Sequence, residues 1–270
     1  MQASLIILGS GTSMGVPTLG CNCRVCTSAD PRDRRLRPSS AVAWPSSSPI
    51  PSPTPLNDHH VIIDTGPDFR AQALANNIQN VDAVLYTHSH ADHILGMDDL
   101  RPLSYKNEGK LPLYADDSTA AVLETIFSYT FSEESQYKLR ARVEMNRLNG
   151  EESVNLFGAS FQRIPLIHGN LMTGGYRFGN AAYLTDLNAI PDSSLPLLTD
   201  LEVVIIDALR LRKHPSHANV EEAMGWVEKI GARQAWFTHI SHEILHEEVE
   251  ASLPSNIRLA YDGLTIPFQL

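Results

Sequence analysis

The chain has 270 residues, of which 43% are hydrophobic and 19% charged, and its formal net charge is −10. This size allows one large domain or two small ones, with a core that needs no disulfide to hold it. The absence of a linker favours one domain over residues 1–270. Because an acidic chain repels a phosphate backbone, nucleic acid is disfavoured as a partner. No stretch reaches the roughly 18 apolar residues of a membrane span, and the start lacks the basic region of a signal peptide. We therefore expect a cytoplasmic protein with no membrane segment.

The first predicted strand, residues 4–8, ends at the glycine-rich stretch GSGTSMG. This loop lacks the glycine spacing of a dinucleotide-binding turn and no clear helix follows it, so it gives little support to such a site. Residues 44–58 are rich in proline and serine. Because proline lacks a backbone donor and fixes φ, this stretch is predicted as an extended loop insert between strands at residues 40–43 and 60–64.

Strand and helix patterns follow one another through the rest of the chain. Strands are predicted at residues 61–63, 83–86, 111–114, 160–167, 181–184, 203–206 and 234–238. Helical patterns cover residues 68–77, 118–129, 219–230 and 244–253. Strands mixed with helices throughout, with no linker between them, indicate a layered α/β or α+β domain.

The segment THSHADH, residues 87–93, carries three histidines and an aspartate directly after the strand at residues 83–86. In an extended or turning segment, side chains two residues apart can point the same way, as His88 and His90 are placed to do. Asp92 and His93 follow on the next turn. Imidazole and carboxylate together suit zinc, manganese or iron, and four such groups in six positions favour a metal site over structural histidines.

An HxHxDH motif after a strand resembles the metallo-β-lactamase-fold hydrolases. The resemblance implies an α+β fold, a four-layer αββα sandwich with two metal ions at one edge of its sheets. It also implies three further ligands, each at a strand end: a histidine, a bridging aspartate and a last histidine. His168, Asp186 and His239 end predicted strands in that order.

The resemblance assigns a role to each of these residues. It implies that one ion is held by His88, His90 and His168, that the other is held by Asp92, His93 and His239, and that Asp186 bridges them. Asp64 matches a family aspartate that supports the histidine loop by hydrogen bonds, although a helix cap before GPDF is an equal alternative. Two ions this close lower the pKa of a shared water. Manganese or zinc, with iron as a further option, fits this ligand set.

All three cysteines of the chain, Cys21, Cys23 and Cys26, lie in CNCRVC. Thiols this close make no useful disulfide framework, which predicts a reducing compartment. Their spacing suits a structural zinc site that lacks a fourth ligand, and His242 in THISH can supply it. Three free thiols with a redox role are the alternative.

The stretch GTSMGVPTLGCNCRVC, followed by DPRDRRLRPS, narrows the resemblance to the phosphoribosyl 1,2-cyclic phosphate phosphodiesterases of phosphonate utilisation, the PhnP-like branch. In that branch a Cys-x-Cys-x-x-Cys loop and a late histidine hold a structural zinc. His217 matches a histidine placed beside the metals, which implies a general acid that protonates the leaving alkoxide. His214 competes for that role, and Asp207 is expected to orient the loop. A solvent-exposed histidine at the helix start is the plainer alternative for His217.

These residues predict a dinuclear metal hydrolase whose shared hydroxide opens a small cyclic phosphate diester, with Asp186 and His217 in the catalytic machinery. A small phosphorylated substrate is the expected partner, and a homodimer is compatible with the family. One rival keeps the fold but acts on RNA 3′ ends, thioesters or lactones, because fold alone does not fix function. The other rival is a non-catalytic metal-binding accessory protein of cofactor biosynthesis.

Overall fold

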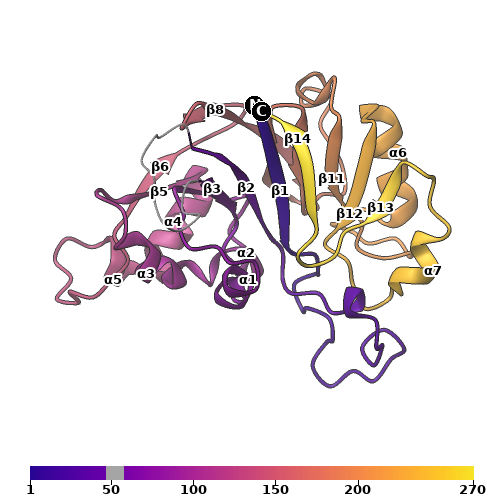
Figure 1. The fold of residues 1–270 in the computed structure, drawn as a ribbon, viewed down its shortest axis with the longest axis horizontal. Coiled ribbons are helices and arrows are strands. Elements are labelled where there is room, and N and C mark those ends of the chain that lie inside the picture. The colour runs from indigo at the N-terminus through magenta and orange to yellow at the C-terminus, as the bar shows by residue number, and fades with distance from the viewer. Residues whose placement is uncertain (47–57) are drawn as a thin grey trace.

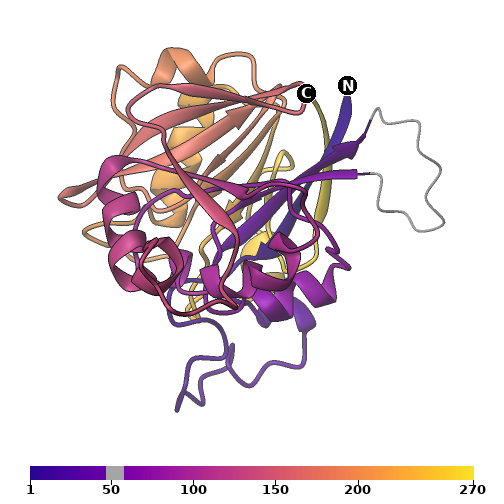
Figure 2. The ribbon, with the colours of Figure 1, turned by 90° about the vertical axis from the view of Figure 1, so that its left-hand side faces the viewer.

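The computed structural model describes residues 1–46 and 58–270 and consists of two stacked sheets with helices on their outer faces (Figures 1 and 2). In order across the first sheet, the strands are β14 (Thr265–Gln269), β1 (Gln2–Gly9), β2 (Ser39–Pro45), β3 (Asp58–Ile63), β4 (Ala83–Leu85), β5 (Leu111–Ala115) and β6 (Val143–Arg147). In order across the second, they are β13 (Ile257–Leu259), β12 (Gln234–Thr238), β11 (Val203–Asp207), β10 (Ala181–Leu184), β9 (Leu171–Phe178), β8 (Ala159–His168) and β7 (Ser153–Leu156). The predicted αββα sandwich is confirmed.

The helices and 3-10 turns lie between these strands. The α-helices are α1 (Phe69–Ala75), α2 (Ala91–Ile94), α3 (Arg101–Ser104), α4 (Asp117–Ile126), α5 (Ser128–Phe131), α6 (Val220–Ile230) and α7 (His246–Glu250). The 3-10 turns are η1 (Pro31–Asp33), η2 (Met97–Leu100) and η3 (Leu195–Leu198). Within the described ranges, no helix has the length and apolar character needed to cross a membrane.

Three apolar layers separate the four structural layers. Between the sheets, side chains such as Leu5 and Val61 of the first sheet meet Phe161 and Tyr183 of the second. A second cluster packs the first sheet against α1 and α4, and a third packs the other sheet against α6. Because both faces of the inner strands are covered, a run such as VVIID in β11 is buried at every position.

The parallel strands β3 to β6 and β10 to β13 bring several strand ends to one edge of the sandwich. The hairpin of β8 and β9 reaches the other sheet there, where the Gly174 amide donates to the Thr87 carbonyl at 2.9 Å. In Figure 1 this edge lies at the bottom, beside a lobe formed by residues 12–30. The topology therefore gathers the ends of both sheets beside that lobe.

Several boundaries differ from the sequence prediction. Trp44 and Pro45 belong to β2, where Pro45 pairs with Asp58 of β3, so the predicted insert at residues 44–58 is too wide at both ends. The remainder of that prediction falls on residues 47–57, outside the described residues. The helix predicted at 118–129 is split at Phe127, whose φ of −104° and ψ of 38° leave the helical region, and the helix predicted at 244–253 spans five residues only.

Candidate metal centre and active site

The motif THSHADH connects β4 to the single-turn helix α2. His88 and His90 precede the helix, and the extended backbone of His90 leaves their two rings 4.5 Å apart. Asp92 and His93 lie within α2 and are both buried. The backbone changes from extended at His90 to helical from Ala91 onward. This change brings the four side chains to one region.

The other predicted residues come from ends of the second sheet. His168 ends β8, Asp186 follows β10, and His239 follows β12. Donor atoms within 4.8 Å of one another form two sets: His88, His90, His168 and Asp186, and then Asp92, His93 and His239. The structure therefore brings together every residue predicted for the dinuclear site, in the predicted grouping, and their binding of metal stays a prediction.

Asp186 lies between the two sets. One of its carboxylate oxygens, Oδ2, is 3.7 Å from His88 Nε2. The other, Oδ1, is 3.2 Å from His93 Nε2 and 3.3 Å from His239 Nε2. Because each oxygen faces a different set, this carboxylate is placed to serve both, as a bridging ligand does.

The unpaired atoms of the cluster fit metal ions. The Nε2 atoms of His88, His93 and His239 are buried without a hydrogen-bond partner. Buried polar atoms normally have a partner, and a divalent cation would provide one for each of these nitrogens. Neutral imidazoles with carboxylates at this spacing are a usual ligand set for zinc, manganese or iron.

Asp64 supports the cluster from behind. Its Oδ2 lies 2.7 Å from His93 Nδ1 and accepts the Thr87 hydroxyl at 2.7 Å, while Oδ1 accepts the Thr87 amide at 2.8 Å. This arrangement holds a proton of His93 on Nδ1 and turns Nε2 toward Asp92 and Asp186, where a metal ion would take the place of the Nε2 proton. Helix α1 begins after Asp68, so the alternative of Asp64 as a helix cap is wrong. Thr87 was assigned no role from the sequence, although its position between β4 and His88 could have indicated one.

The electrostatics of the cluster favour ionised carboxylates. Burial opposes ionisation of Asp186, but the positive charges of His239 and His93 outweigh it and hold the pKa of Asp186 well below its usual range. Burial likewise opposes charge on His93, yet Asp186 and Asp92 raise the pKa of His93 well above its usual value. The same balance, with Asp186 again the main opposing charge, raises the pKa of His239 to about 9. The acids are thus anionic at neutral pH, as cation binding requires.

His217 faces the same cluster. Its donor atom lies within 4.8 Å of those of Asp186 and His239, and its ring stacks on His239 at 4.6 Å. Its Nδ1 is 2.6 Å from Asp207 Oδ2, which fixes the tautomer and turns Nε2 toward the metal ligands. His214 lies farther out, with its ring 5.2 Å from that of His217. The plainer alternative of a solvent-exposed histidine is wrong, because His217 is buried.

Ser216 was missed by the sequence analysis and has no motif of its own. Its backbone carbonyl is 2.7 Å from His168 Nδ1, so it orients that imidazole in the way Asp64 orients His93. Its neighbour in sequence is His217. The loop that presents the predicted acid therefore also holds one of the predicted metal ligands.

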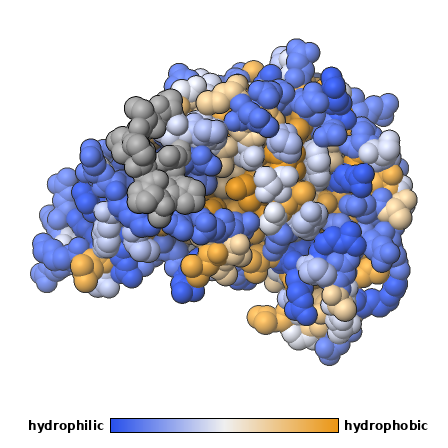
Figure 3. Space-filling model, in the orientation of Figure 1, coloured by the Kyte–Doolittle hydropathy of each residue, from blue (hydrophilic) through white to orange (hydrophobic). Residues whose placement is uncertain are grey.

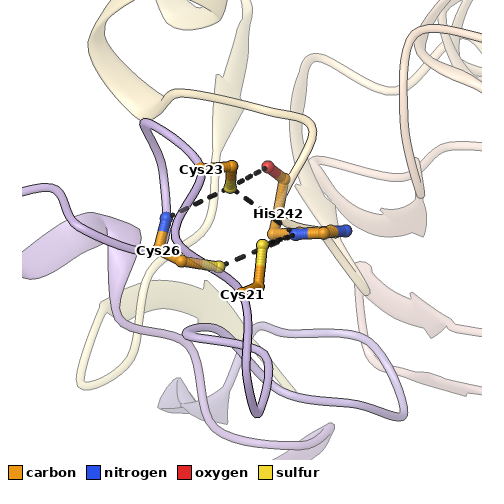
Figure 4. Close-up of side chains that lie close together, drawn as sticks. All are labelled: Cys21, Cys23, Cys26 and His242. Carbon is orange, nitrogen blue, oxygen red and sulfur yellow. Dashed lines mark hydrogen bonds between the residues drawn. The ribbon is translucent and has the colours of Figure 1, made fainter.

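The cysteine loop converges on His242 (Figure 4). The sulfur atoms of Cys21, Cys23 and Cys26 lie 3.3, 3.6 and 3.6 Å from His242 Nδ1. Tetrahedral zinc with its usual bond lengths to sulfur and nitrogen separates these atoms by about 3.5 Å, so the four side chains fit such an ion. The backbone amide of Cys26 lowers the pKa of Cys23 to about 6, which supplies a thiolate at neutral pH. Burial raises the pKa of Cys26 to about 11.

Comparison with known proteins places this geometry in a family. Residues 59–240 match the family model described as the β-lactamase superfamily domain. The crystal structure of a new diphosphatase from the PhnP family is 48% identical, superposes with a TM-score of 0.88, and is matched over 99% of this chain and 98% of that one. Zn²⁺-bound PqqB from Methylobacterium extorquens has a TM-score of 0.74 at 19% identity over 97% and 99% of the chains, a likeness of fold alone.

Among curated proteins, an octanoyltransferase of Porphyromonas gingivalis is 35% identical over 96% of this chain. The match covers 50% of that protein, so the chain spans about half the length of this relative. The family match over most of the chain and the near-complete match to a PhnP-family structure agree with the site geometry. The chain belongs to the β-lactamase superfamily, as a metallo-β-lactamase-fold hydrolase of the PhnP-like branch.

Proposed function

We propose that the chain hydrolyses small phosphorylated molecules at a phosphorus–oxygen bond, with two divalent ions held by the two side-chain sets that Asp186 joins. A small cyclic phosphate diester is the first candidate substrate. The observation that carries the proposal is the position of Asp186, with one carboxylate oxygen toward His88 and the other toward His93 and His239. When bound, two ions there would supply a water nucleophile of lowered pKa and positive charge against the charge that develops on a phosphoryl oxygen.

The chain's own groups supply the rest of the mechanism. Asp64 and Ser216 fix the rings of His93 and His168, so these ligands need no reorientation when substrate arrives. Asp207 holds the proton on His217 Nδ1 and stabilises the ring when it is charged. His217 Nε2 then gives its proton to the departing oxygen, a role in which a positioned acid is worth about 10²–10⁴-fold in rate.

A linear diphosphate is the second candidate, because a 48% identical relative is a diphosphatase. Such a substrate offers the same reacting phosphorus with a phosphate in place of the sugar oxygen as leaving group. Acyl thioesters stay a rival, since another relative is an octanoyltransferase, although the chain spans only half of that protein. RNA ends are a weaker rival because the net charge is −10.

The test is hydrolysis by manganese-loaded and by zinc-loaded protein of three substrates, followed by phosphorus NMR and thiol release. The substrates are a five-membered cyclic ribose phosphate, a P1,P2-disubstituted diphosphate and an octanoyl thioester. Turnover of either phosphorus substrate that is lost in Asp186→Asn supports the proposal. Turnover of the thioester alone, with both ions present, overturns it. Metal found only with the cysteines would favour the non-catalytic accessory protein.

A further inference from the structure

The lobe formed by residues 12–30 stands apart from the sandwich at the lower edge of the molecule (Figures 1 and 3). Beyond the contact of its cysteines with His242, it is tied down where it meets the chain of residues 31–37. There the Val16 amide donates to the Arg35 carbonyl at 2.8 Å, and the Arg35 amide donates to the Val16 carbonyl at 2.7 Å. Arg35 is therefore the backbone partner of the lobe at its base.

The side chain of Arg35 runs the other way, into the protein. It has no exposed surface, and its guanidinium donates to the carbonyl of Ser241 at 3.2 Å and to that of Ile244 at 3.0 Å. It also donates to Asp33 at 2.9 Å, and the same Asp33 oxygen accepts the His246 amide at 2.9 Å. Arginine presents five donors in a rigid planar fork that matches several fixed acceptors at once, whereas lysine offers three donors on a compact, flexible group.

The segment held in this way, residues 241–246, belongs to both predicted metal sites. His242 lies within it, and His239 precedes it with only Ile240 between them. On the opposite side, the Ile240 amide donates to the Ser10 carbonyl, and Gly11 leaves room for Arg35, since a Cβ there would come within 2.9 Å of the arginine Cβ. One buried side chain thus touches the base of the cysteine lobe and the segment that carries a ligand of each site.

We propose that Arg35, with Asp33, is a positioning residue that holds His239 and His242 in register, and so couples the cysteine site to the dinuclear site. Without its guanidinium, the Ile244 carbonyl loses this donor, the Ser241 carbonyl keeps the Ile244 amide at 3.3 Å, and buried Asp33 keeps the His246 amide but loses its positive partner. Segment 239–246 then moves independently of the lobe. Loss of an orienting partner of this kind costs about 10–100-fold in metal affinity.

The experiment compares wild type with Arg35→Lys and Arg35→Ala, each loaded with metal and checked for folding by circular dichroism. Arg32→Gln is the matched control, because Arg32 sits on the same turn but pairs with Asp30 near the surface. The measurements are zinc transfer to a chromogenic chelator, total metal per chain, and hydrogen exchange of residues 239–246. Addition of guanidinium ion to Arg35→Ala tests whether the lost group itself restores the segment.

We expect both Arg35 variants to release zinc about 10–100-fold faster and to exchange faster over residues 239–246, with partial reversal by guanidinium. Dinuclear metal should fall in parallel, while Arg32→Gln stays as wild type. Folded Arg35→Lys with wild-type zinc release and wild-type exchange overturns the proposal, even if its thermal stability is reduced. Loss of metal from one site alone also overturns it, because the coupling is then absent. If Arg35→Ala does not fold, Arg35→Lys decides.

Discussion

Asp64, Asp186 and His239 each adopt a left-handed backbone conformation, with φ of 64°, 52° and 59°. Non-glycine residues rarely occupy this region, and each such residue costs on the order of 1 kcal/mol or more. Asp64 and His239 directly follow β3 and β12, and Asp186 follows β10 after Thr185. All three side chains are buried. The strained backbone positions therefore coincide with the strand ends that present carboxylate and imidazole groups to the cluster.

Replacing Asp186 by asparagine separates charge from backbone conformation, because asparagine tolerates the left-handed region well. We expect Asp186→Asn to fold normally but to weaken binding of both ions at the dinuclear site by about a hundredfold or more, while the cysteine site keeps its zinc. Metal analysis after dialysis against a weak chelator measures this. Asp200→Asn is the matched control, since Asp200 has φ of 58° but is exposed and remote from the site. Equal metal loss in both variants would contradict the bridging role.

The environments of His217 and His214 distinguish the roles expected of the two residues. His217 is buried, bonded to Asp207 and directed at the cluster, while His214 lies outside it. We expect His217→Ala to lower kcat by about 10²–10⁴-fold on an alkyl phosphate diester, whose alkoxide needs a proton to leave. The loss should be much smaller on a p-nitrophenyl ester, whose leaving group needs none, and small for His214→Ala on both. A similar loss on both esters would assign His217 to metal binding instead of proton transfer.

The cysteines provide a prediction that depends on their pKa values and not on catalysis. Because the pKa of Cys23 is about 6 and that of Cys26 about 11, Cys23 is largely a thiolate at neutral pH and Cys26 is largely a thiol. In metal-free protein we expect iodoacetamide to label Cys23 before Cys26, with a rate at Cys23 that rises through pH 6 and then levels off. Peptide mapping by mass spectrometry follows each site. Zinc should suppress the labelling, and preferential reaction at Cys26 would contradict the assignment.

At the scale of elements, helix α2 is held in place by direct backbone contacts with the turn that follows β3. The Thr65 amide donates to the His93 carbonyl and the Gly96 amide donates to the Thr65 carbonyl, each at 2.8 Å. A Cβ on Gly66 would lie 2.1 Å from the Asp92 carbonyl oxygen, and one on Gly96 would lie 2.0 Å from the Gly66 carbonyl oxygen. The turn after β3 and helix α2 can approach this closely only because both positions lack a side chain.

We therefore expect Gly96→Ala to displace α2, with a loss of roughly 1–3 kcal/mol of unfolding free energy and of metal at the dinuclear site. Chemical denaturation and metal analysis measure the two effects. Gly109→Ala serves as control, because a Cβ at Gly109 meets nothing within 4 Å. Full retention of metal by a destabilised Gly96→Ala would show that the close backbone contact between Gly66 and Gly96 does not position Asp92 and His93.

The same elements show what sequence patterns can and cannot reveal. Apolar runs such as those of β10 and β12 predicted both the strands and the residues that follow them, so Asp186 and His239 could be found in advance. Strand β9, LMTGGYRF, escaped because two glycines weaken its pattern; a Cβ on Gly175 would lie 2.6 Å from Leu184. The contacts of Arg35 with Ser241 and Ile244 escaped as well, because these two acceptors lie more than 200 residues away and are backbone carbonyls that leave no mark in the sequence.

At the scale of the whole molecule, strand β1 runs from the chain termini at its start to the predicted metal centre beyond its end. At its start, the terminal amine of Met1 donates to the Leu270 carbonyl at 2.9 Å, and Gln2 pairs with Gln269. Just beyond its end, Gly11 pairs with Ile240, next to His239. Figure 1 shows the two termini together at the top and the cysteine lobe at the bottom. Additional chain joined to either terminus therefore emerges away from the predicted site.

This arrangement predicts that a second folded domain can be joined to Leu270 through a flexible linker without effect on kcat/KM or metal content, because exposed chain ends far from a site tolerate additions. Steady-state kinetics and metal analysis of the fusion measure the effect. The same domain inserted after Asn170, in the turn that follows His168, should lower both quantities, since that turn lies at the metal edge. Reduced activity of the terminal fusion, with the inserted form unaffected, would place the active site near the chain termini, at the start of β1.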